Sequence, residues 1–576
     1  MTDPTGAQIV WDCLTREGVT DVFGYPGGAI LPIYDAMAAY PVRHVLVRHE
    51  QGATHMADGY ARASGRVGVA LATSGPGATN MVTGLATAKM DSSPVVCITG
   101  QVSSHLLGTT AFQEVDITRI AAPVTKESHL VTRPEDIGPT LQRAFAVARE
   151  GRPGPVLVDI TKDAQQGRCA PHPGAPATPA PARRERRGLT QQDRRALELI
   201  ARARRPVILA GHGILLGGAE RELRQFAEAH DIPVALTLLG LGALPASHPL
   251  NLGMMGLHGG VWVNEAIQAA DLLIALGMRF DDRVTGDPAR YAPTARKIHV
   301  DIDPGELNKI IPVDLGIAAD VGRVLRRWLR VDIRRRPSGW SRQIADRRAG
   351  VQQGDRAVAP SEPLTAIQVI QALSRMTGGQ ALVATDVGQH QMWEAQHYGH
   401  ETPRSLITSG GCGTMGFALP AAIGAKLAMP AREVWAVVGD GGFQMAMPEL
   451  ATVVQERLAI KIAIINNGCL GLVRQLQHHF YERRYEAVAL SGPDFIGIGN
   501  AFGIRTCRVD RPDGVESALA DARAHEGPVL IDFRVPEGDL VYPHVRAGAA
   551  LDDMFLRPGT MRGTDTARAL LAMAGA

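Results

Sequence analysis

Segment 434–467 constrains the fold more than any other part of the chain. It starts with an apolar run that ends abruptly in the glycine-rich turn 439–442, which carries Asp440. A helical pattern, expected to begin near Pro448, leads to a second apolar run that ends at Asn467. Two buried strands joined by a helix form a βαβ unit, whose right-handed crossover makes the strands parallel. Asp440 and Asn467 are therefore expected at the carboxyl edge of one sheet, where open α/β sheets bind ligands.

These two side chains have the chemistry of an incomplete magnesium shell. A carboxylate, an amide oxygen and a loop carbonyl are hard ligands, and Mg²⁺ completes such a set with phosphate and water. The neighbouring glycines allow backbone N–H groups to approach a phosphate. A bare GDG is more often a turn with a capping aspartate. The Asn-Asn pair after a complete crossover favours a cofactor site, because the GDG…NN pattern resembles the signature of thiamine diphosphate enzymes.

Strand-like and helix-like segments alternate along nearly the whole chain, in three series. Runs such as 94–100, 206–213 and 381–388 have little polar alternation, which is typical of strands covered by helices on both faces. Breaks rich in Pro, Ala, Arg or other polar residues separate the series. We predict an α/β protein with three Rossmann-like domains and parallel sheets. The predicted domains are 1–166, 189–333 and 364–576, joined by linkers 167–188 and 334–363.

Composition argues against several classes of function. The 576 residues carry 60 Lys and Arg against 58 Asp and Glu, and the net charge of +2 indicates no nucleic acid and no membrane as partners. The chain has no apolar run long enough to span a bilayer and no signal-peptide pattern at its N-terminus. Six cysteines without a CxxC pair fit reduced thiols in a cytoplasmic enzyme. The arginine clusters 183–187 and 334–336 lie in the breaks, which favours solvated linkers over an acidic partner.

Glu50 is the candidate for a second requirement of thiamine diphosphate. The cofactor needs a carboxylic acid at N1′ of its aminopyrimidine ring, so that the 4′-nitrogen removes the proton from thiazolium C2. Glu50 follows the strand-like run 44–47 and starts a helix expected over about 50–62. A first-turn glutamate is also simply favourable at a helix N-terminus. The segment 73–80, with a Gly-Pro-Gly turn before a helix start, could hold a ring and favours the functional interpretation.

Nine segments, in chain order, carry a resemblance to a known family. They read YPGGAILPIYDA, HEQGATHMADGYARASG, TSGPGATN, AFQE, GRPGPVLVDI, GMRFDDRVTG, DVGQHQMWEAQ, SGGCGTMGFALPAAIGA and GDGGFQM…NNGCLGLVRQ. They resemble the large catalytic subunit of acetolactate synthase (acetohydroxyacid synthase) of the biosynthetic type, over about residues 7 to 550. GQHQMW and RFDDRVTG separate this family from pyruvate oxidases, decarboxylases and the catabolic acetolactate synthases.

The resemblance implies a reaction and an assembly. Pyruvate is decarboxylated on thiamine diphosphate, and the hydroxyethyl unit passes to pyruvate or 2-ketobutyrate, giving 2-acetolactate or 2-aceto-2-hydroxybutyrate for valine, leucine and isoleucine biosynthesis. The three domains are, in order, pyrimidine-binding, central FAD-binding (non-redox) and diphosphate- and magnesium-binding. Active sites form between subunits of a homodimer or tetramer, and a small regulatory subunit is an open question. Another thiamine-diphosphate 2-ketoacid carboligase or decarboxylase, and a non-catalytic paralogue, are the alternatives.

The resemblance also implies roles for individual residues. The thiamine diphosphate positions are Tyr25, Glu50, Pro76, Asn80, Val387, Gly388, Gln389, His390, Gly413, Met415, Gly441 and Gly442. The metal ligands are Asp440, Asn467 and the carbonyl of Cys469. The catalytic positions are Glu50, Gly28, Phe112, Gln113 and Lys162. The FAD positions are Arg152, Gly211, Gly213, Met254, His258, Gly277, Arg279, Asp301, Ile302 and Asp320.

Two substrate-binding positions need separate comment. Arg279 matches the arginine that holds the acceptor carboxylate, which suits the planar fork of a guanidinium. A structural ion pair with Asp281 or Asp282 is the alternative. Leu476 stands where the family has a tryptophan that favours 2-ketobutyrate, and Leu472 replaces a methionine of similar volume. We therefore expect this enzyme to favour acetolactate formation and to resist herbicides that stack on that tryptophan.

Overall fold

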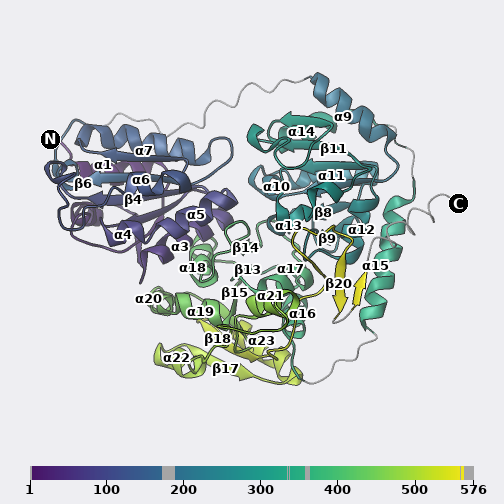
Figure 1. The fold of residues 1–576 in the computed structure, drawn as a ribbon. Helices are drawn as coiled ribbons and strands as arrows, with labels where there is room; N and C mark the ends of the chain where they lie inside the picture. Colours follow the sequence, from purple (N-terminus) through teal and green to yellow (C-terminus); the bar gives the residue numbers. More distant parts are fainter. Residues whose placement is uncertain are drawn as a thin grey trace.

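The computed structural model describes residues 3–171, 188–333, 335, 338–356, 363–557 and 560–562. Over these residues the chain forms three six-stranded parallel sheets in sequence and a short antiparallel sheet near the C-terminus (Figure 1). This is the predicted α/β architecture. The greater part of the predicted linker 167–188, including the arginine cluster 183–187, lies outside the described residues.

The first unit is a sheet with strand order β2-β1-β3-β4-β6-β5. Its strands are β1 (Asp21–Gly24), β2 (Arg43–Leu46), β3 (Gly68–Ala72), β4 (Val95–Gln101), β5 (Glu127–Val131) and β6 (Val156–Thr161). Its helices are α1 (Gly6–Arg16), α2 (Leu31–Ala36), α3 (Glu50–Ser64), α4 (Pro76–Thr79), α5 (Val82–Asp91), α6 (Ile117–Ala121), α7 (Pro134–Arg149) and α8 (Lys162–Gln166).

The central unit has the order β12-β11-β10-β7-β8-β9. Its strands are β7 (Pro206–Ala210), β8 (Val234–Leu236), β9 (Asn251–Met254), β10 (Leu272–Leu276), β11 (Arg296–Asp301) and β12 (Leu315–Ala318). Its helices are α9 (Gln191–Arg202), α10 (His212–Leu216), α11 (Glu220–His230), α12 (Val261–Ala269), α13 (Asp282–Thr285), α14 (Val321–Trp328) and α15 (Trp340–Arg356). Numbered within the unit, this is the doubly wound order 3-2-1-4-5-6, whose switch point falls between β7 and β10.

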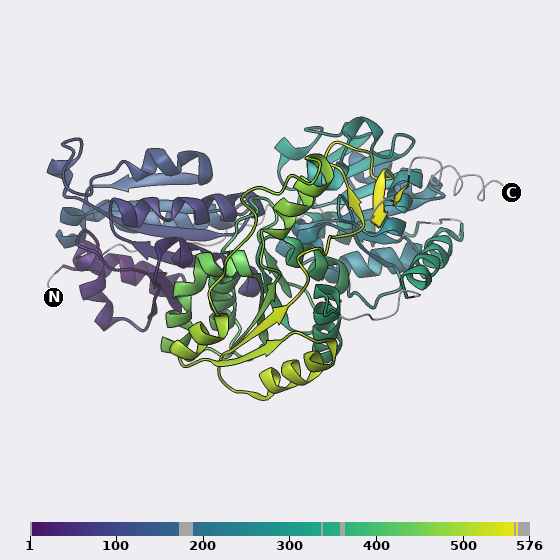
Figure 2. The ribbon, with the colours of Figure 1, turned by 60° about the horizontal axis from the view of Figure 1, so that its bottom comes forward.

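The third unit repeats the order of the first, as β14-β13-β15-β16-β18-β17. Its strands are β13 (Leu382–Thr385), β14 (Leu406–Thr408), β15 (Val434–Gly439), β16 (Ile460–Asn466), β17 (Arg505–Val509) and β18 (Val529–Arg534). Its helices are α16 (Ala366–Thr377), α17 (Gln389–His397), α18 (Ala418–Ala428), α19 (Asp440–Ala446), α20 (Leu450–Gln455), α21 (Gly471–Phe480), α22 (Phe495–Ala501) and α23 (Val515–Ala524). The last described strands are β19 (His544–Val545), β20 (Met554–Arg557) and β21 (Thr560–Arg562), which lie beside the central unit in Figure 2.

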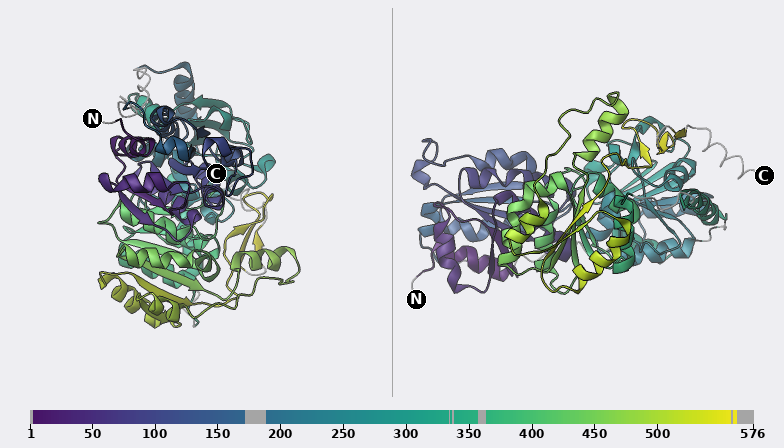
Figure 3. Two further views of the ribbon diagram at one scale, coloured as in Figure 1. Left: turned by 90° about the vertical axis from the view of Figure 1, so that its left-hand side faces the viewer. Right: turned by 90° about the horizontal axis from the view of Figure 1, so that it is seen from below.

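Alternation along the strands explains how the units pack. In β3, Val69 and Leu71 enter the core on the side of α1 and α7, while Ala70 and Ala72 face α3. The small alanine side chains allow α3 to lie close to the sheet. On its other side α3 packs against α18, and residues of both helices share one buried core (Figures 1 and 3). The first and third units are therefore joined by a continuous apolar core.

Two expectations about local structure were wrong. The crossover helix begins at Asp440 itself, as α19, and Pro448 lies in a 3₁₀ turn, Met447–Glu449, between α19 and α20. An aspartate at the first helical position is favoured by the helix dipole, which accounts for the earlier start. The polar stretch 334–363 also contains α15, whose Trp340 and Ile344 are buried in the core of the central unit.

Candidate active site between the units

Asp440 and Asn467 lie beside a small cavity at the carboxyl edge of the third sheet. Asp440 follows β15 directly, and Asn467 follows β16, which is its parallel neighbour. The cavity has a volume of about 50 Å³. The predicted residues in its walls are Val387, Gly388, Gln389, His390, Met415, Asp440, Gly441, Gly442, Asn467 and Cys469.

The donor set at this edge fits a magnesium ion. Burial raises the pKa of Asp440 to about 6, and a cation beside the carboxylate would favour its charged form. The backbone N–H of Cys469 donates to Asn467 Oδ1 at 3.2 Å, and Asn467 Nδ2 donates to Gln389 Oε1 at 3.2 Å, so the amide is oriented. Among the described residues no cluster of three or more His, Cys, Asp or Glu could hold a metal. The available donors are one carboxylate, one amide oxygen and one carbonyl, which is the incomplete oxygen set that Mg²⁺ accepts.

His390 presents a free ring nitrogen in the same cavity. Its Nε2 is buried and has no hydrogen-bond partner within the described part of the chain. Burial lowers the pKa of His390 to about 4, so the ring is neutral near pH 7. A Cβ at Gly439 would lie 2.8 Å from the ring, so the glycine of the GDG turn is needed for His390 to reach this position. An unsatisfied buried nitrogen beside Asp440 is consistent with a polar ligand at this place.

Asp386 is a supporting residue that the sequence did not reveal. Its buried carboxylate accepts hydrogen bonds from the backbone N–H groups of Val387 (2.9 Å), Gly416 (2.9 Å) and Ala418 (3.1 Å). Burial raises its pKa to about 6, against the effect of those N–H groups. It ties the turn after β13 to the loop that carries Met415. Two of the three partners lie 30 and 32 residues away, so the segment DVGQHQMWEAQ, which begins with Asp386, does not by itself reveal this role.

The first unit brings together a second group of predicted residues. Asn80 Nδ2 donates to Glu50 Oε2 at 2.9 Å, and a Cβ at Gly77, beside Pro76, would lie 3.3 Å from Glu50 Oε1. Gln113 packs against the same turn, because a Cβ at Gly75 would lie 2.9 Å from its Cβ. The other predicted residues of this unit have these positions. Tyr25 and Phe112 are exposed, and a Cβ at Gly28 would meet no heavy atom within 4 Å. Lys162 is the first residue of α8.

A large cavity of about 780 Å³ lies between the central unit and the other two. Its lining includes predicted flavin positions Arg152, Gly213, Met254, His258, Gly277, Arg279, Asp301, Ile302 and Asp320, together with Gly413 and Leu476. Gly211 is not in the lining, but a Cβ there would lie 2.4 Å from the carbonyl oxygen of Gly277. Arg279 Nη2 lies 3.4 Å from Asp281 Oδ2, so the ion pair considered as an alternative is present.

Two groups of predicted residues are not brought together within one chain. Glu50, Pro76, Asn80 and Gln113 belong to the lining of neither cavity. Val387 and Leu472 line both the small and the large cavity, so those two share a wall. The aminopyrimidine group therefore shares neither of these two cavities with the other predicted groups in a single copy of the chain.

Comparisons with known proteins agree with this architecture. Three thiamine pyrophosphate enzyme families match in order: the N-terminal TPP binding domain over residues 4–120, the central domain over 194–328 and the C-terminal TPP binding domain over 386–533. Acetolactate synthase of Mycobacterium bovis is 47% identical over 96% of this chain and 91% of its own length. The acetolactate synthase large subunit of Corynebacterium glutamicum is 47% identical over 96% of this chain and 90% of its own length. The probable acetolactate synthase large subunit of Methanocaldococcus jannaschii is 42% identical over 95% of each chain.

The fold, the cavity beside Asp440 and the three matched families define a thiamine diphosphate-dependent enzyme. Sequence identity at this level, over nearly the whole of both chains, also identifies the family within this class. The chain belongs to the acetolactate synthase large-subunit family, and its activity is that of an acetolactate synthase. Within the described residues no helix is both long and apolar enough to cross a bilayer.

Proposed function

We propose that this enzyme decarboxylates pyruvate and joins the remaining two-carbon unit to a second 2-ketoacid, at a site that holds thiamine diphosphate, Mg²⁺ and FAD. The supporting observation is the meeting of Asp440 and Asn467 with the 387–390 turn around one cavity. When bound, thiamine diphosphate supplies a carbon nucleophile and an electron sink for the decarboxylation. The chain's own residues bind and orient the reactants and hold protons.

On the diphosphate side, Asp440, Asn467 and the carbonyl of Cys469 would hold the metal. The backbone N–H of Gly441 donates to the Asp440 carboxylate, and the glycine-rich turn around it would let the diphosphate approach the backbone. His390 Nε2, which is buried and unpartnered among the described residues, is available to a further polar group of the ligand. These groups fix the charged end of the cofactor and leave its ring end to other residues.

On the aminopyrimidine side, Glu50 is the proton-holding group. Asn80 donates to one of its oxygens at 2.9 Å, which leaves the other for a ring nitrogen. Gln113 lies against the same Gly-Pro-Gly turn, and we assign it a contact with the substrate. Because this group lines neither cavity of its own chain, we propose that it completes the site of a second copy, so that a homodimer is the smallest working unit.

The central unit supports the FAD assignment through its topology. A doubly wound sheet of this order binds dinucleotides at its switch point, where β7 and β10 are neighbours. The glycine turns that follow these two strands pack against each other, since a Cβ at Gly213 would lie 2.6 Å from Gly277 Cα. The adjoining cavity of about 780 Å³ lies within the usual range of ligand sites, about 300–1,000 Å³. We assign the flavin a structural role, and Arg279 the acceptor carboxylate.

The assembly extends beyond one chain. Several of the relatives, such as that of Corynebacterium glutamicum, are named as large subunits. We therefore propose that this chain also binds a small regulatory subunit. Co-purification with such a subunit from the same source tests this part of the proposal.

Product analysis tests the reaction itself. The purified chain is given pyruvate with thiamine diphosphate, Mg²⁺ and FAD, and with each cofactor left out in turn. Acetolactate, detected as acetoin after acid treatment, is expected and should vanish without thiamine diphosphate or Mg²⁺. Glu50→Gln should lose most turnover while keeping the fold. Acetaldehyde or acetate from the folded, cofactor-loaded chain would contradict the proposal.

A further inference from the structure

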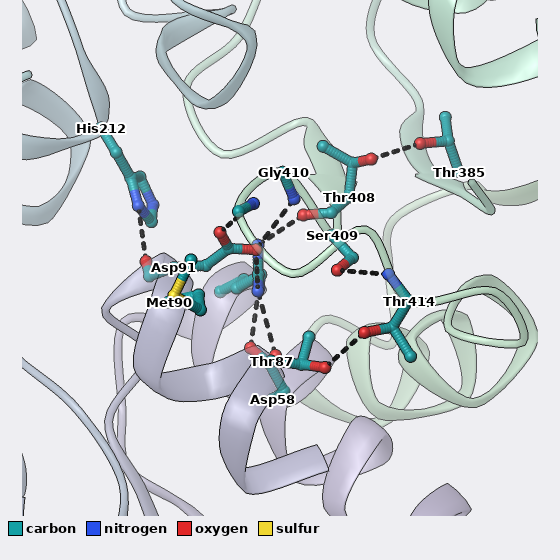
Figure 4. A network of polar contacts seen from close by, with 12 residues as sticks. Asp58, Thr87, Met90, Asp91, His212, Thr385, Thr408, Ser409, Gly410 and Thr414 are labelled. Carbon is teal, nitrogen blue, oxygen red and sulfur yellow. Dashed lines mark hydrogen bonds and ion pairs between the residues drawn. The ribbon is translucent and has the colours of Figure 1, made fainter. Parts of the chain in front are cut away.

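A buried ionic group joins all three units beside the large cavity (Figure 4). Arg62 of α3 forms ion pairs with Asp58 (2.7 Å) and with Asp91 (2.9 Å), the last residue of α5, and donates to the backbone oxygen of Thr408. Arg62 is only 7% exposed, and the two aspartates are buried as well. Burial disfavours its charge, but the two carboxylates outweigh that effect and raise the pKa of Arg62.

The two carboxylates that share the Arg62 guanidinium have different further partners. Asp58 is satisfied within α3 by two bonds from Arg62. Asp91 also accepts from the backbone N–H groups of Gly410 (3.0 Å) and Gly411 (2.7 Å), which belong to the third unit. Its backbone oxygen lies 3.0 Å from His212 Nδ1 of the central unit. Asp91 is therefore the member of the pair that touches all three units.

The loop held by Asp91 forms part of both cavities. Residues 409–413 line the large cavity, and Met415 lines the small one beside Asp440. Thr87, one turn before Asp91 on α5, contacts Thr414 with 2.7 Å between the hydroxyl oxygens. At the far end of the loop, the N–H of Gly416 is bound by Asp386. The loop is thus fixed at one end by the first unit and at the other by the third, with a cavity on each side.

We propose that Asp91 is a positioning residue that couples the two cavities, so that occupation of the large cavity by FAD favours thiamine diphosphate binding at the small one. This inference rests on the proposed function. A flavin beside 409–413 would restrain the loop in the conformation that Asp91 holds, and the same conformation places Met415 in the thiamine diphosphate site. Each ligand then stabilises the arrangement that the other requires, and the coupling is reciprocal.

The test measures the apparent Kd of thiamine diphosphate with Mg²⁺, by quenching of tryptophan fluorescence, with and without saturating FAD. The coupling factor is the ratio of these two Kd values. In the parent enzyme we expect FAD to tighten thiamine diphosphate binding by about 5-fold or more, within the usual range of allosteric coupling. Asp91→Asn should bring the factor close to 1, because an amide loses its charge and presents an N–H group to the loop donors.

Asp58→Asn is the matched control, since it removes a buried carboxylate from the same guanidinium without touching the loop. It should keep the parent's coupling factor. Thr87→Val, which removes only the contact with Thr414, gives a milder second variant and should reduce the factor partly. The inference would be overturned if both Asp91→Asn and Thr87→Val kept the parent's coupling factor, or if Asp58→Asn lowered the coupling factor as much as Asp91→Asn. Either outcome would leave the proposed function intact. A parent enzyme that takes up no FAD would overturn both the flavin assignment and the coupling.

Discussion

At the scale of single residues, the buried Asp159 shows how a strand interior supports the site. Its carboxylate accepts from Thr99 Oγ1 at 2.7 Å and from Gln101 Nε2 at 2.8 Å. The same Gln101 Nε2 also donates to the backbone oxygen of Val115 at 2.8 Å, two residues beyond Gln113. Burial raises the pKa of Asp159 to about 7. A carboxylate of unusual pKa therefore helps to hold the loop that carries a predicted catalytic residue.

This pKa has a consequence for stability. The folded-state pKa of Asp159 lies above its ordinary value, so the folded state holds the proton more tightly and the contribution of Asp159 to stability is lost as pH rises towards 7. Asp159→Asn removes that dependence. The Tm of the variant relative to the parent should therefore increase between about pH 5 and pH 8, measured by thermal unfolding. Asp163→Asn is the control without pH dependence in this range, because hydrogen bonds, chiefly from Ser104, outweigh burial and lower the pKa of Asp163, so its titration falls below about pH 5. A Tm difference for Asp159→Asn that does not change with pH would contradict the expectation.

Leu476 gives a prediction about the acceptor. It lines the large cavity with Leu472 and Arg279 and is 41% exposed, so the wall has room for a larger side chain. Leu476→Trp should raise the preference for 2-ketobutyrate over pyruvate by about 10-fold or more, since one methylene in an apolar pocket is worth about 1–3 kcal/mol. The measurement is the product ratio with both acceptors present. Leu472→Met should leave that ratio nearly unchanged, and a parent that already prefers 2-ketobutyrate strongly would refute the argument.

At the scale of elements, a residue of the third unit binds the backbone just before α3, whose N-cap is His49. The buried Glu449 accepts from the backbone N–H groups of Arg48 (3.0 Å) and His49 (3.1 Å), immediately before Glu50. Its other oxygen accepts from Thr452 Oγ1 at 2.7 Å. A carboxylate at this end of a helix also complements the helix dipole. The turn after α19 thus fixes the position from which Glu50 projects.

Glu449→Gln should loosen this junction. Hydrogen bonds to a charged group are worth about 1.5–3 kcal/mol, so we expect a lower Tm and a lower kcat, because Glu50 is held less firmly. Glu456→Gln is the control on the same chain segment, since it breaks only the partly exposed ion pair with Arg43 and should cost about 0–1 kcal/mol. Thermal unfolding and steady-state turnover measure the two effects. Equal losses in both variants would show that Glu449 has no special role at α3.

A feature can be predicted from the sequence when the residues that determine it lie close together in the chain. Strand ends are local, so the sequence alone places Asp440 and Asn467 at one sheet edge. The helix start at Asp440 escapes prediction, because a turn rich in glycine is a poor local signal for a helix. Asp91 and Glu449 escape it for another reason. Their partners lie 320 and 401 residues away in the chain, and only tertiary packing brings them together.

At the scale of the whole molecule, the first and third units have the same sheet order, and each contributes residues to the proposed site. Both units present predicted cofactor residues at strand ends, Glu50 in one and Asp440 in the other. Within one chain the two units meet through α3 and α18, whose contact is apolar and fully buried. Glu50 does not line the cavity beside Asp440 in its own chain. A pair of chains can instead bring Glu50 of one copy to Asp440 of the other.

Complementation between inactive variants tests this arrangement. Glu50→Gln and Asp440→Asn should each be nearly inactive alone. In a 1:1 mixture with exchanged subunits, half of the dimers are mixed, and each mixed dimer has one site with both halves intact. About a quarter of the parent's turnover should therefore return, since a two-fold dimer has two equivalent sites.

A second mixture makes the result specific. Asp440→Asn and Asn467→Ala damage the same half of the site, so every site in their mixed dimer carries a defect. That mixture should recover almost nothing, although subunit exchange is identical. Recovery in neither mixture, with exchange verified by mass spectrometry, would place both halves of the site within one chain, because only a shared site allows one copy to supply what the other has lost.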